Sequence, residues 1–265
     1  MIDEPRLIIF SGAGLDAGSD IPTFRDTNGL WAGHDISEVC NIATWQRNYA
    51  KVHEFYNERR IELGGAKPNA AHNKIAEWQK RYGVGRVINI TANVTDLLER
   101  AGVQNVMHIH GTLKDIIKDY QYAESSVVDI GYTAYDYRQD VLEDGSYKAR
   151  VKPAVVFFGE TAPRYEDMSH VLFGLRPKDI VILVGSTLEV NPVHRYLMGV
   201  GCKIVNVNPG IDEAIQNASE GRYTPLAEAA DIGDINISES AISGFEKLED
   251  VITDMMDCSS TALGL

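Results

Sequence analysis

The chain has 265 residues, of which 44% are hydrophobic and 24% are charged, so it can bury a sizeable core and has an ordinary globular composition. Its formal net charge of −13 disfavours nucleic acid and anionic membranes as partners and leaves neutral or lysine-rich ones. No segment resembles a signal peptide or approaches the roughly 20 apolar residues that span a bilayer. The three cysteines form no C-x-x-C pair, which argues against a disulfide framework or a cysteine zinc site. We expect a cytoplasmic protein.

Short apolar runs alternate with helical patterns along the chain. Runs rich in Val and Ile predict strands at 6–10, 86–90, 105–109, 153–158, 179–184 and 202–207. Their nearly continuous hydrophobicity is typical of strands buried on both faces. Helical patterns cover 45–63, 69–82 and 93–101, and the last two stop at Gly83 and Gly102. The alternation predicts an α/β fold, a Rossmann-like doubly wound parallel sheet that binds ligands outside the carboxyl ends of its strands.

Two stretches interrupt this alternation and predict a smaller inserted domain. The first, 33–80, is helical; the second, 114–152, contains six tyrosines and an Asp144-Gly145 turn that predicts a hairpin or small sheet. The large domain then consists of 1–32, 81–113 and 153–265. We expect segment 114–152 to be held by its tyrosines and apolar side chains, with partial disorder as the alternative. These apolar residues are Ile116, Ile117, Val127, Val128, Ile130 and Val141.

The stretch "IIFSGAGLDAGSDIPTFRD" places glycines directly after the first predicted strand. Gly12, Gly14 and Gly18 would let backbone N–H groups approach a diphosphate at a helix N-terminus. The same spacing is compatible with a tight turn that binds no ligand. Phe24 and Arg25 would add a ring and a cation beside whatever lies over the glycines.

Six blocks in chain order resemble the motifs of the sirtuin family. They are "GAGLDAGSDIPTFRD" with "GLW", "TANVTDLLERAG", "HIHG", "KPAVVFFGE", "VGSTLEVNP" and "VNVNP", and together they cover about 6–210. The resemblance implies an NAD-dependent protein-lysine deacylase. Such an enzyme uses NAD as co-substrate and an acyl-lysine protein or peptide as substrate, and it releases nicotinamide and O-acyl-ADP-ribose.

The resemblance also implies roles for individual residues. His110, directly before Gly111, matches the general base that draws a proton from a ribose hydroxyl, and Asn93 matches the residue that contacts this ribose. The remaining residues that match NAD contacts are Gly12, Ala13, Gly14, Phe24, Arg25, Thr95, Gly185, Ser186, Thr187 and Asn208. Val156, Phe158, Gly159 and Glu160 match the block that lines the acyl-lysine tunnel and pairs with an extended peptide.

Tyr56 and Arg59 lie at i and i+3 of a predicted helix and therefore share one face. A phenol and a guanidinium at this spacing can bind a carboxylate through charge-assisted hydrogen bonds. An amphipathic helix with no ligand shows the same spacing. The pair resembles the Tyr-x-x-Arg of small bacterial-type sirtuins that accept succinyl and malonyl groups, which implies a preference for acidic acyl groups.

Several positions depart from the family motifs. Ala92 stands for a Gln, Thr95 for the Asp that contacts nicotinamide, Asp16 for a Ser and Asp20 for a Gly. Asp16 is expected to cap the following helix, and its charge to be unfavourable beside a bound diphosphate. Asp96, next to the altered Thr95, is a candidate substitute.

The cysteine pairs of the sirtuin zinc module are absent from 114–152, so no zinc is expected. Together with the altered site residues, this leaves two alternatives to the deacylase open. One is an NAD glycohydrolase, in which water attacks the ribose. The other is an NAD- or ADP-ribose-binding homologue whose turnover is weakened or lost.

Overall fold

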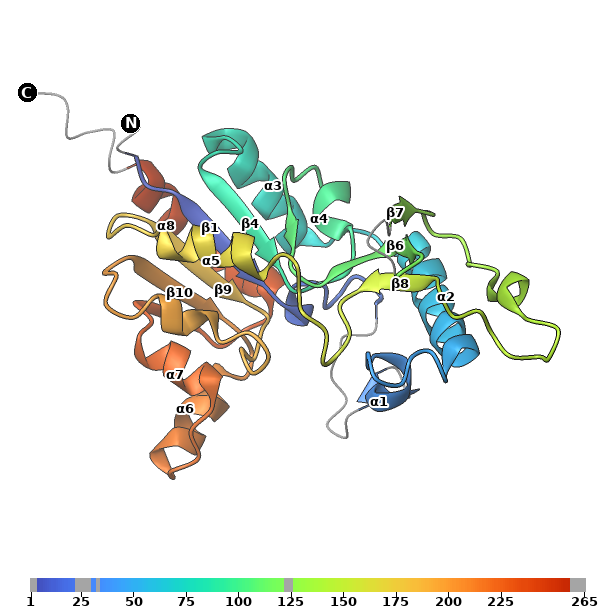
Figure 1. Ribbon diagram of the computed structural model, residues 1–265. Helices are drawn as coiled ribbons and strands as arrows, with labels where there is room; N and C mark the ends of the chain where they lie inside the picture. Colours follow the sequence, from blue (N-terminus) through green and yellow to red (C-terminus); the bar gives the residue numbers. More distant parts are fainter. Residues whose placement is uncertain (1–3, 22–29, 32–33, 122–125, 258–265) are drawn as a thin grey trace, which may run out of the picture.

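A parallel six-stranded sheet forms the centre of the larger part of the protein (Figure 1). The computed structural model describes residues 4–21, 30–31, 34–121 and 126–257. The strand order is β11-β10-β9-β1-β4-β5, and β1 lies between β4 and β9 with all its residues buried. The strands are β1 (Leu7–Ser11), β4 (Val87–Thr91), β5 (Met107–His108), β9 (Ile180–Val184), β10 (Lys203–Val207) and β11 (Ile235–Ile237). The Rossmann-like fold class expected from the sequence is confirmed.

Helices cover both faces of this sheet. Side chains of α3 and α8, including Trp78 and Phe245, form one core cluster with alternate residues of β1. The other residues of β1 pack with α5, α7 and η3 in a second cluster. The helices of the whole chain are α1 (Ile36–Val39), α2 (Tyr49–Gly65), α3 (Ala70–Tyr82), α4 (Leu97–Arg100), α5 (Tyr165–Phe173), α6 (Ile211–Ser219), α7 (Pro225–Asp231) and α8 (Ala241–Asp257). Short 3-10 turns are η1 (Ala13–Leu15), η2 (Tyr137–Asp140) and η3 (Val193–Tyr196).

The start and stop of α3 follow from local sequence. The Asn69 side chain accepts hydrogen bonds from the backbone N–H groups of Ala71 and His72, and His72 accepts one in return from the Asn69 backbone. This reciprocal cap satisfies donors that a helix start otherwise leaves open. Gly83, with φ of 92°, ends the helix as predicted. The predicted division of the chain into domains stays a prediction, although α3 packs on the sheet.

A second, three-stranded antiparallel sheet lies beside the first and has the order β7-β6-β8 (Figure 1). Its strands are β6 (Gly111–Lys118), β7 (Ser126–Asp129) and β8 (Lys152–Val155), and a separate pair consists of β2 (Leu30–Trp31) and β3 (His34–Asp35). The prediction that 153–158 joins the parallel sheet is wrong, because β8 pairs antiparallel with β6. An apolar run indicates burial but not the direction of its neighbour. We call residues 111–121 and 126–155 the small module.

Tyrosine hydroxyls paired with carboxylates hold the small module together. Tyr49 of α2 and Tyr135 both donate to Oδ2 of Asp140, at 2.7 and 2.9 Å. Tyr120 donates to Glu160 at 2.6 Å. This confirms the role expected for the tyrosines and shows that carboxylates complete it.

The apolar side chains contribute less to the small module than the sequence predicted. Ile116 is buried, but Val127 and Val141 are 64% and 44% exposed, so for these two the prediction is wrong. Val127 lies on β7, an edge strand of the small sheet, and Val141 follows η2 outside its three strands. The turn at Asp144-Gly145 is confirmed, since Val141 and Tyr147 form an antiparallel bridge around it.

The described ranges contain neither a metal-binding cluster nor a membrane-spanning helix. There, no group of three or more His, Cys, Asp or Glu side chains is placed to hold a metal ion. Within the same ranges, no helix combines the length and the apolar character needed to cross a membrane.

Candidate functional site

A cavity of about 360 Å³ opens where the carboxyl ends of β1, β4 and β9 meet the small module. This is the edge at which a doubly wound sheet binds its ligands, and the volume is typical of small-molecule sites. Polar residues of the wall include Asp16, Asn93, Thr95, His110, Ser186, Thr187 and Asn191. Other residues of the wall include Cys40, Arg59, Leu113, Val155, Val156, Phe157, Phe158, Gly159 and Glu160.

The glycines after β1 serve chain packing as well as the cavity. The Gly12 N–H donates to Val184 at 2.9 Å and the Gly14 N–H to Gly185 at 2.8 Å. A Cβ on Gly14 would lie 2.6 Å from the Gly185 Cα, so only glycine permits this approach of the two loops. Gly12, Ala13 and Gly185 line the cavity, whereas Gly14 lies behind it.

His110 lies between β5 and β6 and borders the cavity. Its Nδ1 donates to the Ala92 carbonyl at 3.1 Å, which places the lone pair on Nε2. Nε2 lies 3.0 Å from the Tyr165 hydroxyl and 3.3 Å from the Asn191 amide nitrogen. Burial lowers the pKa of His110 below its usual value of 6.5, so the imidazole is neutral near pH 7. A neutral ring with its lone pair on the cavity side can act as a general base.

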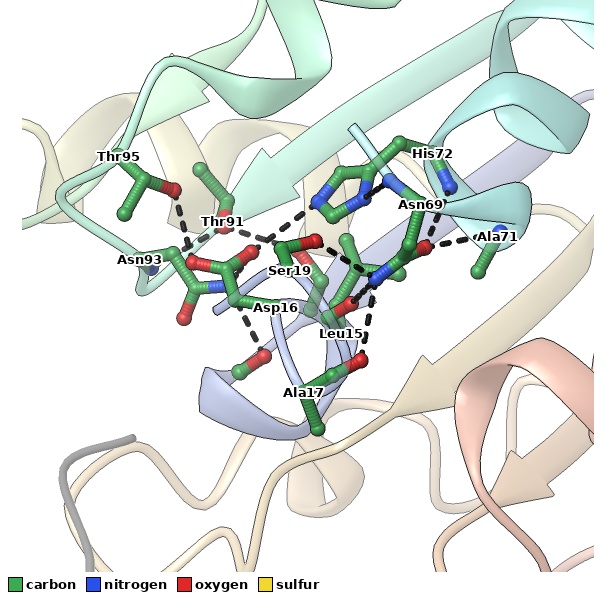
Figure 2. Close-up of polar contacts among 12 residues, drawn as sticks. Leu15, Asp16, Ala17, Ser19, Asn69, Ala71, His72, Thr91, Asn93 and Thr95 are labelled. Atoms are coloured by element: carbon green, nitrogen blue, oxygen red, sulfur yellow. Dashed lines mark hydrogen bonds and ion pairs between the residues drawn. The ribbon is translucent and has the colours of Figure 1, made fainter. Parts of the chain in front are cut away.

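Asn93 and Thr95 lie in the loop after β4 and converge on Asp16 (Figure 2). The Asn93 amide donates to the Gly12 carbonyl and to Asp16 Oδ1, both at 3.0 Å, and the Thr95 hydroxyl donates to Asp16 Oδ2 at 2.8 Å. The prediction that Asp16 caps a following helix is wrong, because η1 ends at Asp16 and residues 16–20 form turns. The carboxylate points instead to the loop after β4.

Asp96 does not take the place expected for it. Its Oδ2 accepts a hydrogen bond from the Tyr132 hydroxyl at 2.6 Å and lies 3.7 Å from Lys114, both in the small module. Among the described residues, Asp16 lines the cavity and Asp96 does not. The reason is geometric, since side chains that are neighbours in a loop point in different directions.

The segment after β9 contributes Gly185, Ser186 and Thr187 to the wall. Asn208, which the resemblance also assigns to the cofactor, lies behind this wall. Its amide donates to the Ser186 carbonyl at 2.9 Å, and its Oδ1 accepts from the Gly210 N–H at 2.9 Å. Asn208 thus positions the loop that carries Ser186. Phe24 and Arg25 lie outside the described residues.

The segment after β8 forms another part of the cavity wall. The Val156 N–H donates to the His110 carbonyl and the Phe158 N–H to the Cys40 carbonyl, both at 2.9 Å. These two N–H groups are therefore engaged within the chain, and the expected pairing of this segment with a peptide stays a prediction. Glu160 turns to the small module, where Lys152 lies 3.0 Å from its carboxylate. Val156, Phe158, Gly159 and Glu160 all line the cavity, as expected of a tunnel wall.

The two residues of the Tyr-x-x-Arg pair occupy different environments. Arg59 lines the cavity and is 9% exposed. Its Nε and Nη2 donate to Glu62, each at 2.7 Å, whereas its buried Nη1 has no hydrogen-bond partner. Tyr56 is fully buried behind the wall, next to the Cys40 thiol. Burial, with Cys40 next to it, raises the pKa of Tyr56 well above its usual value.

Sequence reasoning missed Tyr165, Asn191 and Cys40 as cavity residues. Tyr165 and Asn191 are 55 and 81 residues from His110 in sequence, and no motif spacing connects them. Asn191 does stand inside the "VGSTLEVNP" block, which was the available hint.

The fold and the cavity define a class of protein: a Rossmann-like domain with a small-molecule site at the carboxyl edge of its sheet and a half-buried, neutral histidine beside that site. A profile of the Sir2 family matches residues 12–192. An NAD-dependent protein deacylase of Helicobacter hepaticus is 40% identical over 222 residues, covering 76% of this chain and 85% of that protein. An NAD-dependent protein deacylase of Mycobacterium leprae is 34% identical, and the match covers 81% of this chain and 90% of that protein. The chain belongs to the Sir2 family.

Solved structures agree with this assignment. A mutant Sir2 homologue in complex with ADP ribose superposes with a TM-score of 0.72 at 28% identity, covering 99% of this chain and 96% of that one. A complex of a Sir2 homologue with NAD gives a TM-score of 0.70 at 29% identity, with 96% and 91% covered. The sirtuin resemblance inferred from the six blocks is confirmed.

Proposed function

We propose that this protein, an NAD-dependent protein deacylase of the Sir2 family, prefers lysine acyl groups that end in a carboxylate, such as succinyl or malonyl. The observation that carries the preference is the Nη1 of Arg59, a buried cationic donor without a partner on the cavity wall. A buried, unsatisfied donor of this kind favours a ligand that accepts from it. Tyr56 would add a second hydrogen bond on turning from Cys40.

The cavity residues also fit the co-substrate. NAD, when bound, supplies the ribose carbon that receives the acyl oxygen as nicotinamide leaves. We assign Asn93, Ser186 and Thr187 to hold its hydroxyl groups, because the Asn93 amide oxygen can accept a hydrogen bond and the two side-chain hydroxyls can donate and accept. His110 takes a ribose proton at Nε2, after the ribose hydroxyl displaces that of Tyr165. The apolar wall from Val155 to Phe158 keeps competing water from the site.

The substrate is an acyl-lysine side chain presented by a protein or peptide, which is compatible with the acidic net charge of −13. The free, buried thiols of Cys40 and Cys202 support the expected cytoplasmic compartment. Nucleic acid and anionic membranes remain disfavoured as partners, because the same negative net charge would repel them. No zinc is proposed.

The test compares matched succinyl-lysine and acetyl-lysine peptides, following nicotinamide and peptide mass together. Arg59→Met is expected to lower kcat/KM for the succinyl peptide by roughly 10- to 100-fold, the effect of one charge-assisted hydrogen bond, with the acetyl peptide changed less than about threefold. Glu62→Gln is the matched control, since it keeps Arg59 and removes the charge of its nearer carboxylate partner, while Glu58 stays 3.6 Å from Nη2; succinyl turnover should persist or rise. Equal losses on both peptides would contradict the preference, and nicotinamide release without peptide change would indicate an NAD glycohydrolase.

A further inference from the structure

Asp16 is a buried carboxylate at the edge of the cavity, with 5% of its surface exposed. Three side chains from two distant segments reach it: Asn93 and Thr95 from the loop after β4, and His72 from α3. Figure 2 shows the carboxylate between these three partners. A cluster that gathers so many donors on one group holds that group in a single orientation.

His72 contributes a donor whose proton position follows from its other contact. Its Nδ1 accepts from the Asn69 backbone N–H at 3.2 Å, so in the neutral ring the proton lies on Nε2. Nε2 is 3.1 Å from Asp16 Oδ1 and therefore donates to it. The Asn69 amide donates to the carbonyl groups of Leu15 and Ala17, which fixes the turn on both sides of Asp16.

The same carboxylate determines how Asn93 presents its amide. Both N–H bonds of the Asn93 side chain are engaged, one by the Gly12 carbonyl and one by Asp16. The amide oxygen is thereby left as the acceptor of this side chain for a ligand in the cavity. Without Asp16 the amide could rotate, and the acceptor would no longer have a fixed position.

Asp16 and Thr95 are also two of the positions at which this chain departs from the family motifs. The motifs carry Ser at the position of Asp16 and Asp at that of Thr95, so hydroxyl and carboxylate are reversed here. The structure brings the two side chains, 79 residues apart, to a hydrogen bond of 2.8 Å. The two departures thus meet in one contact, with a hydroxyl and a carboxylate still present at these two positions.

We propose that Asp16 and Thr95 form one exchanged hydroxyl–carboxylate pair, and that Asp16 is the positioning residue that orients Asn93 for the NAD reaction. The substitution of Thr95 for Asp therefore does not remove the negative charge from this end of the cavity; Asp16 supplies it from the opposite loop. This inference rests on the proposed NAD chemistry, and on no particular acyl preference.

The exchange is tested by a double-mutant cycle of Asp16→Ser, Thr95→Asp and the two together. Nicotinamide release is measured with whichever acyl-lysine peptide the parent protein turns over faster, so a wrong acyl preference does not affect the result. Asp16→Ser should lower kcat/KM for NAD by roughly 10- to 100-fold through the lost charge-assisted hydrogen bonds. Thr95→Asp should cause a similar loss, because it places two carboxylates side by side. The double variant, which restores one carboxylate and one hydroxyl, should recover to within about fivefold of the parent.

A second readout separates positioning from mere stability and needs no turnover. The same four proteins are titrated with ADP-ribose by calorimetry, and urea unfolding checks that each is folded. Asp16→Asn, which keeps the shape and loses the charge, replaces Asp16→Ser if that variant does not fold. Recovery of kcat/KM and of ADP-ribose affinity in the double variant supports the exchange; if the parent has no turnover, recovery of affinity alone does so. The exchange would be overturned if the losses of kcat/KM and affinity in the two single variants multiplied in the double variant. It would also be overturned if the single variants matched the parent.

Discussion

The cavity edge and the small module each place a carboxylate among side-chain donors, and they use it in different ways. Asp16 is buried, accepts from Asn93, Thr95 and His72, and borders the cavity. Asp140 accepts from the two tyrosines Tyr49 and Tyr135 and ties α2 to the small module. The first cluster orients the Asn93 amide at the cavity, whereas the second cross-links a layer with few buried apolar side chains. Polar clusters of similar chemistry thus differ by whether they border the cavity that His110 lines.

The largest expected difference between the cavity edge and the small module is in turnover, and it is tested by substituting one histidine in each region. His110→Ala removes the proposed base, and kcat for deacylation should fall by roughly 100- to 10,000-fold while ADP-ribose affinity changes little. His53→Gln is the control, because His53 lies in α2 and donates to the Val151 carbonyl at 3.0 Å, away from the cavity. Its kcat should stay within about twofold of the parent. Comparable turnover losses in both variants would mean that the two regions are not separable.

Two glycines with nearly the same positive φ differ in what surrounds them. Gly185 and Gly131 have φ values of 64° and 63°, but a Cβ on Gly185 would lie 2.5 Å from the Leu15 nitrogen, and one on Gly131 would meet nothing within 4 Å. Gly185→Ala should lower the free energy of unfolding by roughly 2–4 kcal/mol through strain and overpacking. Gly131→Ala should cost about 1 kcal/mol, for the left-handed conformation alone. Urea unfolding measures both, and equal costs would show that the cavity edge is no more tightly packed.

Stability should depend on pH through His53. Burial lowers the pKa of His53 to about 4 from the usual 6.5. Its buried Nδ1 has no hydrogen-bond partner, so a proton added there would have no acceptor. Because the pKa is lower in the folded protein, the stabilisation is fully present above pH 6.5 and is lost as the pH falls towards 4, by up to about 3 kcal/mol. Urea unfolding of the parent and of His53→Gln at pH 7.5, 6 and 5 isolates this contribution as their difference. A difference that does not change with pH would contradict it.

The carboxylate of the small module should have a smaller and purely structural effect. Asp140→Asn keeps one acceptor oxygen for Tyr49 and Tyr135 but loses the charge, and should lower the free energy of unfolding by about 1–2 kcal/mol. Asp136→Asn, an exposed residue one turn away that still caps η2, should change it by less than about 0.5 kcal/mol. Hydrogen exchange over 126–155 should rise only in Asp140→Asn. Faster exchange in the central sheet instead would mean that Asp140 supports the whole fold.

The sequence by itself determined the parallel sheet, the helices with clear stop signals, and the blocks that carry His110 and Asn93. These features are local: burial on both faces makes a strand continuously apolar, and a glycine ends a helix where the chain must turn. The direction of β8 was not determined, because an apolar run does not encode its partner.

Only the tertiary structure decided which distant side chains meet. Asp16 and Thr95 looked like two separate losses in the sequence, and the fold joins them in one hydrogen bond. Tyr165 reaches His110 from α5, and Asp96 turns to Tyr132 and away from the cavity, although neither contact has a sequence signature. The physical reason is that motif spacing constrains neighbours along the chain, whereas hydrogen bonds between remote segments depend on how strands and helices are placed against one another.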